Sequence, residues 1–124
     1  MERKDIRVYV AGPLTGEQPG PVSYIHNLNR MTRVCLDIMK MGAAPYNPGS
    51  DLMQGLVSGE LALEDYMSVS SAWLKGAHVV FRMEGVSPGA DAEEAVAMDH
   101  DIPIVYDFKQ LEHQIRVLAG ECNV

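Results

Sequence analysis

Short apolar runs alternate with segments of helical spacing along this 124-residue chain. Four runs have the length and composition of β-strands, at residues 7–10, 43–46, 78–83 and 102–108. Four segments place apolar side chains three or four positions apart, as amphipathic helices do, at residues 23–41, 63–77, 91–100 and 109–118. Glycines interrupt the segment 52–63, which we interpret as a loop with some helical turn.

This alternation of strands and helices predicts an α/β fold. We expect a three-layer, Rossmann-like (flavodoxin-like) parallel sheet of four to five strands flanked by helices. The length suits one domain that spans residues 1–124. Ser23 is expected to cap the first long helix, and Gly42 to end it.

Two loops rich in glycine and proline each follow a predicted strand. They are AGPLTG at residues 11–16 and GVSPGAD at residues 85–91. Because ligands of parallel α/β sheets bind at the carboxyl ends of the strands, we expect both loops to form one site. An ordinary strand-to-helix connection explains the first loop about equally well.

The charge balance narrows the range of partners. The net charge is −7, and the ten basic residues form no run, which argues against duplex DNA or RNA as a partner. A small phosphate at a helix N-terminus stays possible. No apolar run approaches the ~20 residues of a membrane span, so no membrane partner is expected.

Targeting and metal signals are also missing from the sequence. Charged residues lead directly into the first strand without the apolar segment of a signal peptide, so we expect a cytoplasmic protein. Cys35 and Cys122 lie far apart, which fits a reducing compartment. The four histidines have no metal-ligand spacing, and we expect neither a metal nor a cofactor.

Glu93 and Glu94 form an acidic pair in the helix that follows the second loop. On a helix, Glu93 faces small and apolar residues, whereas Glu94 is grouped with Asp91 on a more solvated side. A carboxylate on a buried side is costly unless it is paired or used, which makes Glu93 the candidate for chemistry. We expect the amides of Ala90 and Asp91 to help keep it ionised, and Glu94 to be a surface charge. An acidic first turn without any function explains both glutamates as well.

Four stretches of the chain, taken in order, resemble a known enzyme family. They are VYVAGPLTG, GAAPYNP, EDYMSVSSAWLKGAHVVF and SPGADAEEAVAMDHDIPIVY. Their order and spacing are similar to the nucleoside 2-deoxyribosyltransferase superfamily, including its deoxynucleoside 5′-monophosphate N-glycosidase branch and small phage-borne relatives. The resemblance covers roughly residues 6–107.

The resemblance implies roles for particular residues. Glu93 corresponds to the family nucleophile, Tyr9 lies close to it, and Ser87 helps to bind a 5′-phosphate. The substrate-binding residues expected on this basis are Gly12, Pro13, Leu14, Gly16, Ser87, Gly89, Ala90 and His78. The family also implies a homodimer or higher homo-oligomer, and an apolar helix face that includes Met31, Leu36, Met39 and Met41 is compatible with it.

The chain departs from the family pattern at two positions. Relatives carry aspartates where Ser70 and His78 stand, and serine is a poor general acid. Asp65 and His78 are therefore candidate proton donors. Activation of the substrate by another residue is an equally open alternative.

These observations favour a nucleoside 5′-monophosphate N-glycosidase that forms a covalent glycosyl-glutamate intermediate. Hydrolysis is favoured over transfer because the chain is short and Ser87 suits a terminal phosphate. The alternatives are a non-catalytic nucleotide-binding protein of the same fold and a nucleoside deoxyribosyltransferase. A phosphoribohydrolase is a weaker alternative, since the chain carries only part of the PGG-x-GT-x-x-E run.

Overall fold

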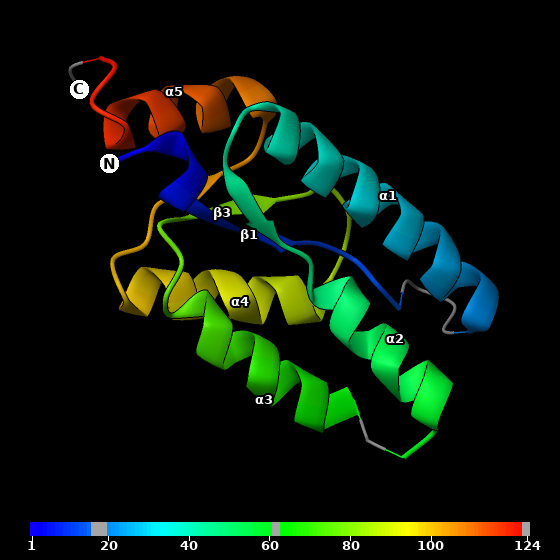
Figure 1. The fold of residues 1–124 in the computed structure, drawn as a ribbon. Helices are drawn as coiled ribbons and strands as arrows, with labels where there is room; N and C mark the ends of the chain where they lie inside the picture. Colours follow the sequence, from blue (N-terminus) through cyan, green and yellow to red (C-terminus); the bar gives the residue numbers. More distant parts are fainter. Residues whose placement is uncertain (16–19, 61–62, 123–124) are drawn as a thin grey trace.

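The computed structural model describes residues 1–15, 20–60 and 63–122 and contains one parallel β-sheet between helices (Figure 1). The strands are β1 (Arg7–Ala11), β2 (Ala44–Tyr46), β3 (Val79–Arg82) and β4 (Ile104–Val105). The helices are the 3-10 helix η1 (Arg3–Asp5), α1 (Pro21–Lys40), α2 (Pro48–Ser58), α3 (Leu63–Leu74), α4 (Pro88–Asp99) and α5 (Phe108–Leu118). The strand order is β2-β1-β3-β4, and all neighbours are parallel.

The sheet has a core on each face because successive side chains of a strand point in opposite directions. Val8 and Val10 of β1 belong to a core shared with α1 and α5, whereas Tyr9 and Ala11 belong to a core shared with α3 and α4. Figure 1 shows these two helix pairs on opposite sides of the sheet. The predicted three-layer α/β fold is therefore confirmed, with four strands.

The order of the strands indicates where along the carboxyl edge of the sheet a ligand is expected to bind. The chain leaves β1 and crosses to β2 on one side, and later returns to β3 on the other side of β1. The strand order therefore switches between β1 and β3. The loops that leave these two neighbouring parallel strands lead to helices on opposite faces of the sheet, α1 and α4. Those loops are the two Gly/Pro-rich segments singled out in the sequence.

The segment that we interpreted as a loop is largely a regular helix, α2, so that interpretation was wrong. Asn47 caps it, since its side chain accepts a hydrogen bond from the amide of Gly49, and Pro48 occupies the first helical position. Position 55 within the helix requires a glycine, because a β-carbon there would come 2.8 Å from the ring of Tyr66. Left-handed Gly59 ends it.

The N-terminal part of the chain differs from the sequence-based expectation at two places. The first long helix starts at Pro21, two residues before Ser23, and Gly20 occupies the cap position. Residues 3–5 form η1 instead of leading directly into a strand. Over the described residues, no helix combines the length and apolar character that a membrane span requires.

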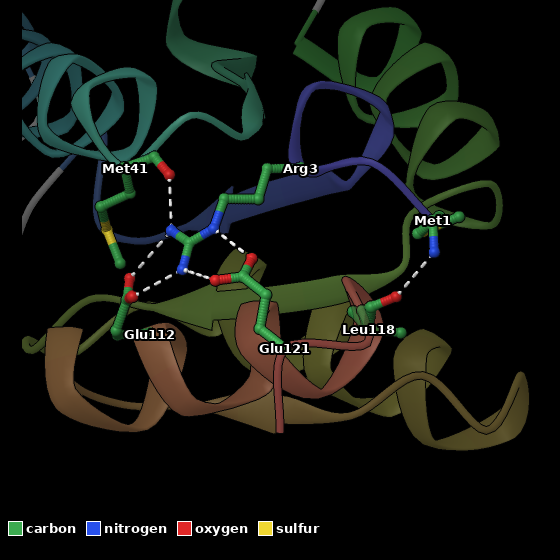
Figure 2. Close-up of polar contacts among 6 residues, drawn as sticks. All are labelled: Met1, Arg3, Met41, Glu112, Leu118 and Glu121. Carbon is green, nitrogen blue, oxygen red and sulfur yellow. Dashed lines mark hydrogen bonds and ion pairs between the residues drawn. The ribbon is translucent and has the colours of Figure 1, made fainter. Parts of the chain in front are cut away.

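Arg3 of η1 joins three distant segments of the chain, as Figure 2 shows. Its guanidinium donates to the carbonyl of Met41 at 2.8 Å and pairs with Glu112 at 2.9 Å and Glu121 at 2.6 Å. Both carboxylates raise the pKa of Arg3, chiefly through the hydrogen bond with Glu121, and Arg3 lowers the pKa of Glu121. The end of α1, helix α5 and the C-terminal turn are thereby tied to the start of β1.

Replacement of this residue, Arg3→Ala, should lower the free energy of unfolding by about 1–2 kcal/mol, because several charge-assisted hydrogen bonds are lost at a partly solvated site. Urea denaturation measures the change. Lys4→Ala is the matched control, since the Lys4–Glu2 pair is largely exposed and should contribute almost nothing. Equal stability losses for the two variants would contradict the assigned role of Arg3.

Candidate active site

The two Gly/Pro-rich loops pack against each other at the carboxyl edge of the sheet. A β-carbon on Gly12 would lie 2.9 Å from the Cβ of Met83, so the missing side chain lets the first loop cross the end of β3. Gly85 has a φ of +122°, and a β-carbon there would meet the ring of Pro13 at 2.8 Å. The two loops therefore lie against each other, as the sequence-based hypothesis of a shared site requires.

A cavity of about 450 Å³ opens between these loops and helices α2, α3 and α4. Most of its wall consists of apolar side chains and small residues. The lining residues are Gly12, Pro13, Leu14, Thr15, Pro48, Leu52, Tyr66, Met67, Ser70, Ser71, Val86, Ser87, Pro88, Gly89, Ala90, Ala92, Glu93 and Val96. Its volume lies in the range of small-molecule sites.

The first turn of α4 is built by Ser87, which is buried. Its side-chain oxygen accepts a hydrogen bond from the amide of Ala90 at 3.1 Å, and its carbonyl accepts one from the amide of Asp91 at 2.9 Å. Ser87 is therefore the N-cap of α4. These two amides are used by Ser87, so the expectation that they hold the carboxylate of Glu93 was wrong.

Glu93 projects from α4 into the cavity and meets Tyr9 of β1. The Tyr9 hydroxyl donates a hydrogen bond to Oε2 of Glu93. Burial raises the pKa of Glu93 from 4.5 to about 7, while the hydrogen bond from Tyr9 and the positive charge of Arg82 act in the opposite direction. The carboxyl group is consequently close to half ionised near neutral pH.

Tyr9 is held rigidly below the cavity. Its side chain is fully buried, and its ring stacks on that of Tyr46 at a centroid distance of 5.4 Å. Tyr46 in turn stacks on Trp73 at 6.0 Å. Burial and the negative charge of Glu93 both raise the pKa of Tyr9, which therefore acts as a neutral hydrogen-bond donor.

Arg82, at the end of β3, ties α4 to the sheet. Its guanidinium is buried and donates to the carbonyl of Gly85 at 3.0 Å and to Asp91 at 3.2 Å. Its Nε lies 3.2 Å from the carboxylate of Glu94. Glu94 is therefore not the surface charge that we expected, because Arg82 reaches the side of the helix on which it stands.

A second polar cluster lies where α2 and α3 meet. Tyr46 donates a hydrogen bond to Oδ2 of Asp51, and the Ser70 hydroxyl reaches the same oxygen at 3.5 Å. Ser70 is buried in the cavity wall, while Asp51 stands behind it and does not belong to the lining. Ser70 also forms a hydrogen bond that lowers the otherwise raised pKa of Tyr9. The cluster thus adjoins the Tyr9–Glu93 pair.

The structure brings most of the expected site residues together. The cavity wall contains Gly12, Pro13, Leu14, Ser70, Ser87, Gly89, Ala90 and Glu93, and Tyr9 contacts Glu93. Gly16 lies outside the described residues.

Two candidate residues lie away from the cavity. His78 precedes β3, so it stands at the amino edge of the sheet, where its Nδ1 accepts a hydrogen bond from the amide of Arg7 at 2.9 Å. Asp65 is exposed on α3, because Tyr66 and Ser70 occupy the inward face of that helix. Neither belongs to the residues that line the cavity.

Sequence reasoning missed Arg82, Asp51 and Tyr66. An arginine within an otherwise apolar strand is a usable signal, because a buried charge requires partners. Asp51 was missed because the start of α2, whose first turn contains it, was not predicted. Tyr66, whose buried hydroxyl has no hydrogen-bond partner among the described residues, resembles any other aromatic residue at helical spacing.

Neither a family model nor a curated protein matches this chain. The described part of the chain contains no group of three or more His, Cys, Asp or Glu side chains placed to hold a metal ion. The chemistry of the site is therefore argued from its own residues.

The raised pKa of Glu93 predicts a specific effect on stability. Between about pH 4.5 and 7 the folded state binds its proton more tightly than the unfolded state does, so the free energy of unfolding falls as pH rises. Glu93→Gln removes this loss and should stabilise the protein by about 2–3 kcal/mol at pH 8, with little gain below pH 4.5. Denaturation of both proteins across this pH range measures the difference.

Glu94→Gln is the matched control, with the opposite sign expected. It takes a carboxylate from the buried guanidinium of Arg82 and should lower stability near neutral pH. If Glu93→Gln destabilised the protein equally at every pH, a purely packing role for Glu93 would replace the electrostatic one.

Proposed function

We propose that this protein is a retaining N-glycosidase that cleaves the base–sugar bond of a nucleoside or nucleoside 5′-monophosphate. The observation that carries the proposal is the Glu93 carboxyl group, which faces a largely apolar cavity and is held by the buried hydroxyl of Tyr9. A partly ionised carboxylate in a poorly hydrated site is suited to attack a sugar carbon.

The reaction uses Glu93 twice. Its carboxylate attacks C1′ of the sugar, the bond from C1′ to the base nitrogen breaks, and a glycosyl ester forms on Glu93. Water then attacks C1′, which releases the sugar and restores the carboxylate. Tyr9 orients the nucleophile through its hydrogen bond, and the apolar wall formed by residues such as Leu52 and Val96 limits access of water to the ester.

Ser87 and the adjacent start of α4 are proposed to face the sugar end of the substrate. Ser87 and Gly89 both line the cavity, and a small residue at position 89 leaves the backbone accessible. Transfer of the sugar to a second base, instead of to water, would proceed through the same ester and is the related transferase activity.

A non-catalytic nucleotide-binding protein is the second candidate. The hydroxyl of Ser70, which stands where relatives of the resembled family carry an acid, is directed to Asp51 and is a weak proton donor. A protein that kept the cavity and lost turnover would show this arrangement.

The proposal includes a cytoplasmic homodimer. Helix α1 exposes Val22, Ile25, Leu36 and Met39, which supports self-association. Met31, which we grouped with that face, is instead fully buried in the core.

Incubation with a panel of nucleosides and nucleoside monophosphates should release free base, measured by chromatography. Glu93→Ala should reduce the rate by about 10³-fold or more, because it removes the nucleophile. Glu84→Ala is the matched control: Glu84 is exposed outside the cavity lining, and its loss should leave the rate unchanged. Nucleotide binding without base release from any substrate would favour the non-catalytic protein.

The pH profile should follow the ionisation of Glu93. kcat/KM should rise with pH through about 7, because the carboxylate is the reactive form. The Tyr9 hydroxyl and Arg82 both lower the pKa of Glu93, so Tyr9→Phe should move this limb to higher pH. An unshifted limb in Tyr9→Phe would show that the titrating group is not the one that Tyr9 contacts.

A further inference from the structure

The charge that the cavity presents to a ligand is negative. Glu93 is the one carboxylate in the described lining, and no Lys, Arg or His belongs to that lining. Arg82 lies outside the lining and pairs with Asp91, Glu94 and the carbonyl of Gly85 through Nη2 and Nε, while its buried Nη1 has no hydrogen-bond partner among the described residues. The net charge of −7 adds to the same field.

The start of α4 has little left to offer an anion. Pro88 has no amide hydrogen, and the amides of Ala90 and Asp91 are already bonded to Ser87. Of the first four positions of the helix, Gly89 alone retains an amide without a bond to Ser87. A dianionic phosphate placed here would lie in the same apolar cavity as the carboxylate of Glu93.

The proton donors around Glu93 are hydroxyl groups, which are weak acids. Tyr9 donates its hydrogen bond to Glu93, and the Ser70 hydroxyl lies 3.5 Å from Oδ2 of Asp51 and also forms the hydrogen bond that lowers the pKa of Tyr9. The Tyr66 hydroxyl is buried against Gly55 of α2. A neutral nucleoside needs an acid near its departing base, because the base otherwise leaves as an anion.

We propose that the cavity takes nucleosides whose base carries a positive charge, such as N7-alkylated purine or pyridinium nucleosides. This inference rests on the glycosidase activity proposed above and specifies its substrate class. A carboxylate in apolar surroundings attracts a cationic base, and the buried pair with Tyr9 keeps that carboxylate in place.

A cationic base removes the need for an acid. Glu93 attacks C1′, the C1′–N bond breaks, and its electron pair stays on the ring nitrogen, where it cancels the positive charge. The base leaves neutral and takes no proton. Water then attacks C1′ of the glycosyl ester, the sugar gains a hydroxyl group, one proton passes to solvent, and the carboxylate of Glu93 is restored.

Two matched substrate pairs test the inference. Guanosine and 7-methylguanosine differ by one methyl group and one charge, and reduced and oxidised nicotinamide riboside differ in the charge of the ring. We expect kcat/KM for base release to be at least about 100-fold higher for the charged member of each pair. The difference must exceed that of the uncatalysed reactions, which are measured in parallel.

Binding provides a readout that does not depend on leaving-group quality. At a pH where Glu93 is ionised, oxidised nicotinamide riboside should bind at least about tenfold more tightly than the reduced form, as measured by calorimetry. Glu93→Gln, which keeps the shape and removes the charge, should abolish this preference. Glu84→Gln, the matched change outside the cavity, should preserve it.

The outcomes separate the two proposals. Equal processing of charged and neutral nucleosides, or a preference for the 5′-monophosphates, would overturn the cationic substrate class while the glycosidase activity stands. Charge-dependent binding that Glu93→Gln abolishes, without base release from any substrate, would support the charge selectivity of the cavity and overturn the glycosidase activity.

Discussion

The contact between Tyr9 and Glu93 joins the centre of the sheet to the helix that covers it, and the site is arranged around this contact. Tyr9 is fully buried on β1 and stacks on Tyr46, so the position of its hydroxyl is set by the packing of the core. Glu93 is brought to it because Ser87 caps α4 and Arg82 holds two acidic residues on that helix. A carboxylate held in this way is largely removed from water and has no direct ion pair, which is why burial raises its pKa.

Burial of the Glu93 carboxyl group costs stability when the group is ionised. Under the proposed function, the same burial favours reaction, because a carboxylate with few water contacts is a better nucleophile. The rest of the fold compensates with interactions far from the cavity. Arg3, for example, ties η1 to α5 and the C-terminal turn. These contacts lie near the amino end of β1, whereas the loops of the site lie at the carboxyl edge of the sheet.

The layers of the fold were predictable from sequence, and so was the loop pair of the site. Alternating apolar runs and helical spacing located all four strands, and the glycines at positions 12 and 85 marked the loops that cross. Helix α2 was not predictable in the same way, because Gly55 and Gly59 argue against a helix when considered locally. Its stability depends on the Asn47 cap and on the ring of Tyr66, and the second of these contacts is formed only in the tertiary structure.

The partners of charged residues were the least predictable feature. Helical spacing separated Glu93 from Glu94 correctly by direction, yet it contained no information about Arg82, which reaches Glu94 from a neighbouring strand. Asp51 likewise becomes relevant only because α2 brings it behind Ser70. The direction of a side chain follows from local geometry, whereas the identity of its partner depends on register and crossing of elements far apart in the chain.

The cluster of Asp51, Tyr46 and Ser70 bears directly on which reaction the cavity can catalyse. Ser70 lies in the cavity wall, and its hydroxyl lies 3.5 Å from the carboxylate of Asp51 behind it and adjoins Tyr9. Tyr46 links this cluster to Tyr9 by stacking, so the hydroxyl and the nucleophile are held by one rigid group of rings. Under the proposed function, a cavity that holds its carboxylate in place and offers only weakly acidic hydroxyl groups is better suited to bases that depart without protonation than to bases that require it.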